Sequence, residues 1–322
     1  MMYFQLIGGI VVMLAAAEIF IRGAISLAKI LNIPPLVIGM TVVAIGTSAP
    51  ELMVTLDASL SGAPGLAVGN LIGSNIANVL LILGVSCLLS PMKGPESANF
   101  RDGFVLMAGS AMFALLCAQG QLSLLSGGVL FMAFLGFLAS TYRQESADEE
   151  AIAEHILEIE GMTPIDAPMG VVVLSILGGL VGIVWGADLI VEGGVAIARV
   201  FGISEEIIGL TVIAFGTSLP ELAASVVAAF RGHSDIAVGN VVGSNLFNIL
   251  GIAGLVAMVA PLPVSDEILT FDIWVMLAAT ALVLPILGGR WHPRRASGVF
   301  FLTLYIAYIG YNAFLAGFFA VG

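Results

Sequence analysis

Long apolar runs, separated by short polar stretches, cover most of the 322 residues of this chain. A run of about 20 apolar residues is long enough to cross the hydrocarbon core of a bilayer as an α-helix. The alternation of apolar and polar positions that predicts membrane β-strands is absent, and the runs are too long for such strands. The pattern therefore predicts ten transmembrane helices, at residues 3–28, 35–60, 66–90, 102–118, 122–142, 169–196, 205–229, 236–260, 271–288 and 297–320.

The composition is that of a membrane protein rather than a soluble one. Hydrophobic types make up 59% of the residues, charged types make up 10%, and the mean hydropathy is +1.11. A soluble domain has about 25% charged residues, so we expect an all-α integral membrane protein. The net charge of −12 owes much to a short acidic stretch at 145–166. No basic patch of the kind that binds nucleic acid is present.

The basic residues predict how the helices are oriented, because cytoplasmic ends and loops of membrane proteins carry an excess of Lys and Arg. With ten helices and the N-terminus outside, Arg199 is the one basic residue on the outer side. Both termini are thus predicted to lie outside. The residues that fall on the inner side are Arg22, Lys29, Lys93, Arg101, Arg143, Arg231, Arg290, Arg294 and Arg295.

The chain also contains an internal duplication. When the sequence is shifted by 170 residues, GMTVVAIGTSAPEL at 39–52 aligns with GLTVIAFGTSLPEL at 209–222. At the same shift, LAVGNLIGSNIAN at 66–78 aligns with IAVGNVVGSNLFN at 236–248. Two such blocks at one offset indicate that the halves arose from a common unit, with repeated motif regions at 39–78 and 209–248.

Each half contains five predicted helices, and because five is odd, the second half enters the membrane from the opposite side. We therefore expect two inverted five-helix repeats, at 1–142 and 169–322. An acidic cytoplasmic linker at 143–168 joins them. Inverted repeats are typical of secondary transporters, in which the binding site lies between the repeats near the middle of the bilayer.

The GTSAPE segment interrupts an apolar helix with groups that bind cations. Pro50 has no amide hydrogen and its ring clashes with the carbonyl of Gly46, so the helix is expected to open between Ala44 and Thr47. Backbone carbonyls freed in a membrane need protein, water or an ion as a partner. Carbonyl, hydroxyl and carboxylate oxygens together are ligands suited to hard cations such as Ca²⁺.

Glu51 and Glu221 are the acids of the two motif copies, and inversion brings them toward each other. A buried carboxylate is costly unless it is paired or protonated. A divalent cation, monovalent cations or protons could each neutralise this pair, and competition among them is the chemistry of an exchange site. The second block adds a polar stripe at four-residue spacing to each half: Asn70, Ser74 and Asn78, and Asn240, Ser244 and Asn248.

The two GTSxPE motifs and the two GSNxxN motifs resemble the α-repeats of the calcium/cation antiporter superfamily, specifically its prokaryotic sodium/calcium exchanger branch. The resemblance covers nearly the whole chain. It implies Na⁺-driven Ca²⁺ transport by alternating access across the prokaryotic cytoplasmic membrane, with both ions as substrates and with no cofactor or obligate protein partner. The ion ligands that it implies are Glu51, Glu221, Thr47, Thr217, Ser48, Ser218, Ala44, Ala214, Ser74, Ser244, Asn78 and Asn248.

One departure from the family leaves the coupling ion open. Some members carry Asp where this chain has Asn in both repeats, so the formal charge of the site is −2 rather than −3. A Ca²⁺/H⁺ antiporter, or an antiporter for another divalent cation, is therefore an alternative on the same scaffold. An intramembrane hydrolase that uses the two glutamates is a further reading, but the sequence offers no Ser–His set. A passive channel is a fourth.

Overall fold

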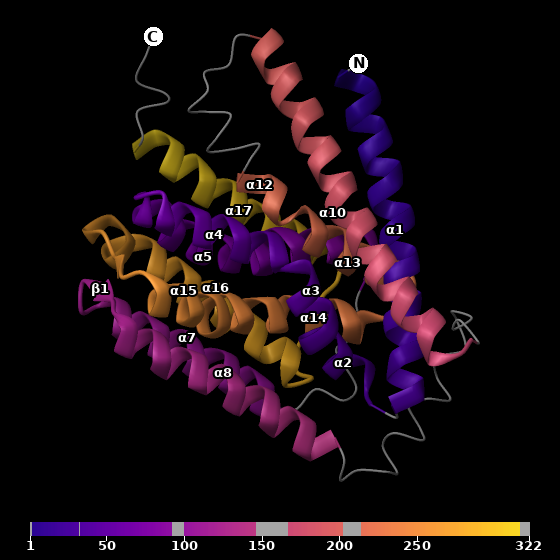
Figure 1. Cartoon of the computed structure of the whole chain (residues 1–322), viewed down its shortest axis with the longest axis horizontal. Coiled ribbons are helices and arrows are strands. Elements are labelled where there is room, and N and C mark those ends of the chain that lie inside the picture. The colour runs from indigo at the N-terminus through magenta and orange to yellow at the C-terminus, as the bar shows by residue number, and fades with distance from the viewer. Residues whose placement is uncertain (1, 32, 92–99, 146–166, 202–213, 316–322) are drawn as a thin grey trace.

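The computed structural model describes residues 2–31, 33–91, 100–145, 167–201 and 214–315 (Figure 1). Helices account for most of this part of the chain, as predicted. Those of the first half are α1 (Met2–Leu31), α2 (Pro35–Ile38), η1 (Gly39–Val43), α3 (Ala44–Thr47), α4 (Ala49–Leu60), α5 (Pro64–Ala77), η2 (Asn78–Ile82), α6 (Leu83–Leu89), α7 (Phe100–Cys117) and α8 (Leu124–Glu145). Those of the second half are α10 (Met169–Val200), α12 (Ala214–Thr217), α13 (Leu219–Phe230), α14 (Ser234–Leu246), η5 (Phe247–Ile252), α15 (Ala253–Val259), η6 (Ile268–Asp272), α16 (Ile273–Leu287) and α17 (Arg295–Leu315).

Six helices in the described part of the chain are long and apolar enough to cross a membrane, or seven if the bent helix pair at residues 36–60 counts as one span. The predicted spans at 102–118 and 297–320 correspond to α7 and α17, which do not belong to these six. Much of the predicted span at 205–229 and most of the linker lie outside the described residues. The membrane character is thus clear, while the count of ten stays a prediction.

Two short strands were not predicted. β1 (Gln121–Leu122) pairs antiparallel with β2 (Leu262–Pro263). Gly120 has a φ of +84°, a conformation that glycine adopts without steric cost, and its carbonyl accepts a hydrogen bond from the Val264 amide at 2.9 Å. The strands therefore satisfy backbone groups where the chain turns after α7, and they correct the all-helical expectation at four residues.

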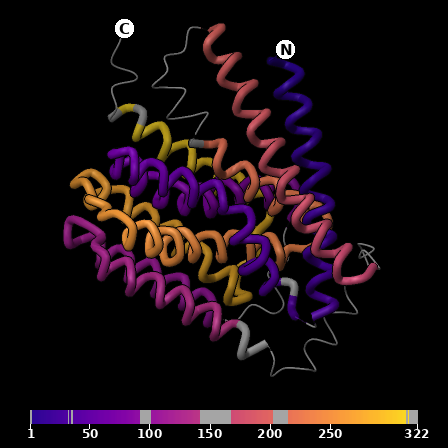
Figure 2. The backbone as a smooth tube through the Cα atoms, viewed as in Figure 1, coloured from indigo at the N-terminus to yellow at the C-terminus, as the bar shows by residue number. Residues whose placement is uncertain are grey.

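The helices α1 and α10 lie side by side at one edge of the bundle (Figures 1 and 2). They contain 30 and 32 residues, so at about 1.5 Å per residue they exceed the roughly 30 Å hydrocarbon core. They run antiparallel, since Gly9 meets Gly186 while Gly23 meets Ile176. Glycines allow this close approach: a Cβ atom on Gly9 would stand 2.7 Å from the Gly186 carbonyl oxygen.

The two halves are interlocked rather than laid side by side. Gly254 of α15 packs against α8, where a Cβ atom would stand 2.7 Å from the Phe131 amide nitrogen. Gly298 of α17 packs against α6, where a Cβ atom would stand 2.6 Å from the Gly84 carbonyl oxygen. The last helix of each half therefore packs on a helix of the other half. Neither half buries its apolar surface alone.

An ionic contact joins α1 to the turn between α13 and α14. Glu18 accepts hydrogen bonds from Arg22 at 2.8 Å, the pairing expected for residues four apart on one helix, and from Arg231 at 2.9 Å. Both arginines also lie 2.7 Å from Glu18 as salt bridges. The position equivalent to Arg231 in the first half is Ser61, so the repeat gave no signal for this second pairing.

Adjacent glycines of α10 provide a test of the α1–α10 contact. A Cβ atom on Gly179 would stand 2.8 Å from the backbone of Phe20, whereas one on Gly178 would meet nothing within 4 Å among the described residues. We expect Gly179→Ala to destabilise the protein by about 1–3 kcal/mol, the usual cost of overpacking. Gly178→Ala should leave stability unchanged or slightly raised. Thermal unfolding in detergent compares the two, and equal melting temperatures would contradict the predicted close contact.

Candidate cation site

Both GTSxPE segments break their helix at the serine. Ser48 has φ −84° and ψ 10°, and Ser218 has φ −87° and ψ 1°. The helices on either side of Ser48 are bent by 44°. We expected the opening between Ala44 and Thr47, and this placement was wrong, because the Ala44 carbonyl still accepts the Ser48 amide at 3.0 Å. Pro50 is the second residue of α4, where its missing N–H is tolerated, so the break falls one residue further on.

The break brings groups from both halves together in the interior. The Ser48 hydroxyl donates to Glu221 Oε1 at 2.8 Å, and the Thr47 hydroxyl donates to Asn240 Oδ1 at 3.3 Å. Glu51 and Glu221 are each 1% exposed, and the Ser48 contact joins Glu221 to the start of the helix that carries Glu51. The first motif of one half therefore contacts the acid of the other half in the interior, as inversion of the halves requires.

Several oxygens at this place have no hydrogen-bond partner within the described residues. Both carboxylate oxygens of Glu51 and Oε2 of Glu221 are buried and unpaired. A buried polar group without a hydrogen-bond partner destabilises the folded state, and a buried charge without a partner destabilises it more. Such atoms mark a place that an ion, a proton or water occupies. Other unpaired buried atoms near the motifs are Asn78 Oδ1, Ser244 Oγ, and Nδ2 and Oδ1 of Asn248.

The remaining predicted ligands are placed as follows. Ser74, Thr217 and Ser218 are 6%, 8% and 3% exposed, and Ala44 is fully buried. Ala214 is the first residue of α12, and its side chain is outside the described part. No group of three or more His, Cys, Asp or Glu side chains that could hold a metal ion occurs among the described residues. The candidate ligands that the sequence predicted are therefore two carboxylates with hydroxyl, amide and carbonyl oxygens.

Asn240 and Asn70 brace the helices that carry the glutamates. Asn240 donates to the Ser225 hydroxyl at 2.9 Å and to the Glu221 carbonyl at 3.3 Å. Asn70 donates to the Thr55 hydroxyl at 3.0 Å and to the Glu51 carbonyl at 3.5 Å. Sequence reasoning missed both hydroxyl partners. A signal was present, because residues 55 and 225 are related by the 170-residue offset and both carry a hydroxyl.

Two further asparagines were also missed. Asn78 donates through Nδ2 to Asn245 Oδ1 at 3.0 Å, and Asn245 donates to the Asn75 carbonyl at 3.3 Å. Both Asn75 and Asn245 belong to the GSNxxN motif. They were passed over because they do not share the four-residue spacing of the polar stripe.

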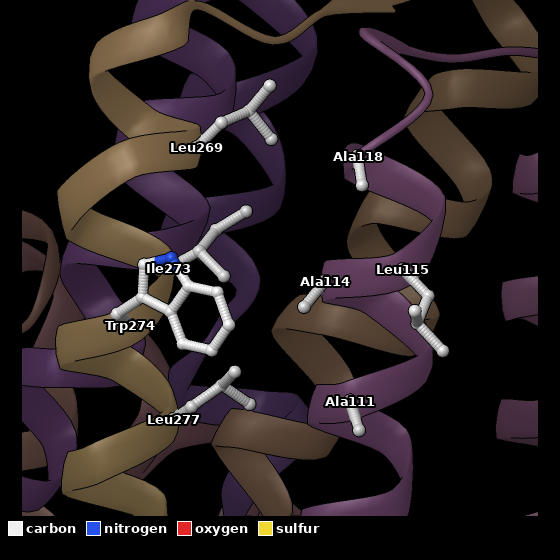
Figure 3. Close-up of a pocket in the computed structure, with 8 residues that line it drawn as sticks. All are labelled: Ala111, Ala114, Leu115, Ala118, Leu269, Ile273, Trp274 and Leu277. Atoms are coloured by element: carbon white, nitrogen blue, oxygen red, sulfur yellow. The ribbon is translucent and has the colours of Figure 1, made fainter.

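A cavity of about 400 Å³ lies elsewhere, between α7 and the η6–α16 helix. Figure 3 shows its walls, with Ala111, Ala114, Leu115 and Ala118 on one side and Leu269, Ile273, Trp274 and Leu277 on the other. These side chains offer no oxygen ligand. Leu115 and Trp274 are 72% and 64% exposed, so this hollow lies on the apolar outer surface and is separate from the cation site.

Comparison with protein families assigns residues 1–143 and 171–314 to the family described as sodium/calcium exchanger protein. The chain belongs to this family. It is 36% identical over 295 residues to the inner membrane protein YrbG of Escherichia coli, covering 91% of this chain and 90% of that protein. It is 32% identical over 333 residues to the sodium/calcium exchanger MaX1 of Methanosarcina acetivorans, covering 94% and 95%.

The fold is similar to that of a solved exchanger. The sodium–calcium exchanger NCX_Mj, in crystals soaked with Na⁺ and Ca²⁺, superposes with a TM-score of 0.82 at 30% identity, over 96% of this chain and 97% of that one. The family resemblance inferred from the motifs is thereby confirmed. This member of the exchanger family is a multi-pass membrane transporter of cations and not an enzyme, so the hydrolase reading is dropped.

The bracing asparagines provide a test of the site's construction. Asn240 is fully buried and forms hydrogen bonds both with Thr47 of the first half and with groups of its own half. Asn70 is only half-buried, and its hydrogen bonds stay within its own half. Asn240→Ala should lower the free energy of unfolding by about 1–3 kcal/mol, because it leaves buried polar groups without hydrogen-bond partners. Asn70→Ala should lower it less, because water can replace the lost hydrogen bonds. Thermal unfolding of the two purified variants makes the comparison. A larger loss in Asn70→Ala would show that this bonding pattern is wrong.

Proposed function

We propose that this protein is a secondary antiporter that exchanges Na⁺ for Ca²⁺ by alternating access, with Glu51 and Glu221 as the central cation ligands. The observation that carries the proposal is the pair of buried carboxylates, one from each half, with three of their four oxygens unpaired within the described residues. Their combined formal charge of −2 equals the charge that one Ca²⁺ or two Na⁺ ions would cancel.

The surrounding oxygens support binding of hard cations. Hydroxyls of Thr47, Ser48 and Ser218 come from the two helix breaks, and Ser244 Oγ lies buried and unpaired on α14. The Ala44 carbonyl accepts the Ser48 amide at 3.0 Å and the Thr47 hydroxyl at 3.4 Å. The Thr47 hydroxyl also reaches Asn240 Oδ1 at 3.3 Å, and donating to that atom alone would free a lone pair of the Ala44 carbonyl for an ion. The other proposed ligands are Thr217, Ala214, Ser74, Asn78 and Asn248.

We infer that the halves are inverted repeats and that both termini lie outside the cytoplasmic membrane. Elements at the 170-residue offset fold alike: each GTSxPE segment breaks at its serine, and each polar stripe continues into a π-helical turn, η2 or η5. The antiparallel contact of α1 with α10 is the arrangement that a two-fold axis in the membrane plane produces.

One chain contributes both glutamates, so a monomer suffices to form the site.

Exchange of Ca²⁺ for H⁺ is the second candidate, since a buried carboxylate without a partner can be neutralised by a proton as well as by a metal ion. Uptake of ⁴⁵Ca²⁺ into proteoliposomes separates the two. Vesicles loaded with Na⁺ and diluted into Na⁺-free buffer are compared with vesicles that carry only a pH gradient. We expect uptake to require internal Na⁺; uptake that follows the pH gradient and ignores Na⁺ would move the function to Ca²⁺/H⁺ exchange.

Glu51→Gln should reduce this uptake by more than about 10-fold, because a buried ligand charge is removed from the site. Asp57→Asn is the matched control on the same helix, since Asp57 is exposed and lies six residues beyond Glu51. It should transport like the unmodified protein. Equal uptake by Glu51→Gln and Asp57→Asn would argue against Glu51 as a ligand.

Binding can also be measured without transport. A ligand that binds only the folded state stabilises it by about 2.7 kcal/mol at 100 times its dissociation constant. We expect Ca²⁺ to raise the melting temperature of the detergent-solubilised protein and Glu221→Gln to abolish most of that rise. Mg²⁺ at equal concentration is the control for ionic strength. The same Ca²⁺-dependent rise in Glu221→Gln would place the ion elsewhere.

A further inference from the structure

The asparagines of the two GSNxxN motifs occupy equivalent positions but make unequal contacts. Asn245 is related to Asn75 by the 170-residue offset, as Asn248 is to Asn78. Asn245 reaches into the first half, where it accepts from Asn78 Nδ2 at 3.0 Å and donates to the Asn75 carbonyl at 3.3 Å. The Asn75 side chain instead donates to the Leu71 carbonyl of its own helix, at 2.6 Å.

The contact with Asn245 fixes which end of the Asn78 amide is free. An asparagine amide has donors on nitrogen and an acceptor oxygen, and here the nitrogen is held while Oδ1 is buried without a partner. The segment η2, which begins at Asn78, packs against α13, the helix that carries Glu221. Asn78 therefore offers an oxygen rather than an N–H group to the interior beside that helix.

Asn248 has no such neighbour in the described part of the chain. It is fully buried, and neither its Oδ1 nor its Nδ2 has a hydrogen-bond partner there. Its segment η5 packs against α4, the helix that carries Glu51. One amide is thus held in a fixed orientation beside one glutamate helix, while the equivalent amide beside the other is not held.

We propose that Asn245 is a positioning residue for the cation site: by accepting the Asn78 N–H, it holds the Asn78 amide oxygen in the orientation that binds the transported cation. This inference rests on the proposed function. Without that contact the Asn78 amide is free to rotate and to present a partial positive charge where a cation must bind. The loss of one orienting hydrogen bond of this kind corresponds to about 3- to 10-fold in cation affinity.

The test compares Asn245→Leu with its matched control Asn75→Leu. Initial rates of ⁴⁵Ca²⁺ uptake into Na⁺-loaded proteoliposomes are measured over a range of Ca²⁺ concentrations. Asn245→Leu should raise KM for Ca²⁺ by about 3- to 10-fold with a smaller change in maximal rate. Asn75→Leu should leave KM close to that of the unmodified protein, because its side chain donates its hydrogen bond to a carbonyl of its own helix rather than to the other half.

Asn245→Asp is the conservative variant, because its carboxylate still accepts the Asn78 N–H although it no longer donates to Asn75. It should keep KM at or below the unmodified value. If Asn245→Leu does not fold, Asn245→Ser, which is too short to reach Asn78, replaces it in the same assay. A rescue by Asp after loss in Leu or Ser is the result that a role in helix packing alone does not produce.

The proposal is overturned if Asn245 and Asn75 variants change KM equally, or if they lower only the maximal rate or the amount of folded protein. In that case uptake by the unmodified protein remains, and the proposed function stands. Absence of any Ca²⁺ uptake by the unmodified protein would overturn both. The unmodified protein and Glu51→Gln are measured in parallel, so the two failures are distinguishable.

Discussion

Two carboxylates that are buried in the interior of a membrane protein, with most of their oxygens unpaired, set the conditions for the rest of this structure. Neither Arg nor Lys is paired with Glu51 or Glu221 in the described part of the chain. Uncompensated charge in such surroundings is costly, so the fold must supply polar groups around it, and under the proposed function a cation supplies the rest of the compensation. The helix break at Ser48 helps to meet that need, because it places the Ser48 hydroxyl on Glu221.

The site exists only where the halves meet. Ser48 of one half binds Glu221 of the other, and Asn245 binds Asn78 in the same crossed manner. The surrounding helices also cross between the halves. The last helix of each half packs on a helix of the other half through close contacts at Gly254 and Gly298. A change in the relative position of the halves would therefore act directly on the proposed ligands, as coupling of movement to binding in a carrier requires.

The duplication does not make the halves equivalent in their contacts. Asn240 is fully buried and bonded to Thr47, while Asn70 at the matching position is half-buried. Glu18 is paired with two arginines, whereas the matching Asp188 is exposed. Inverted repeats in a transporter need not adopt the same conformation at one time, because access from one side alone makes their surroundings differ.

The sequence by itself determined the membrane class, the spans of most long helices and the two motif acids that the fold buries. Apolar run length and the repeated GTSxPE and GNxxGSN blocks depend only on local composition and on the 170-residue offset. Tertiary structure alone decided where the helix breaks, which groups cross between halves, and that Asn245 rather than Asn75 does so. Those choices depend on distances between helices far apart in the chain. The two motif copies are nearly identical in sequence, so the sequence cannot predict which copy makes the contact with the other half. That choice depends on the different neighbours against which each copy packs.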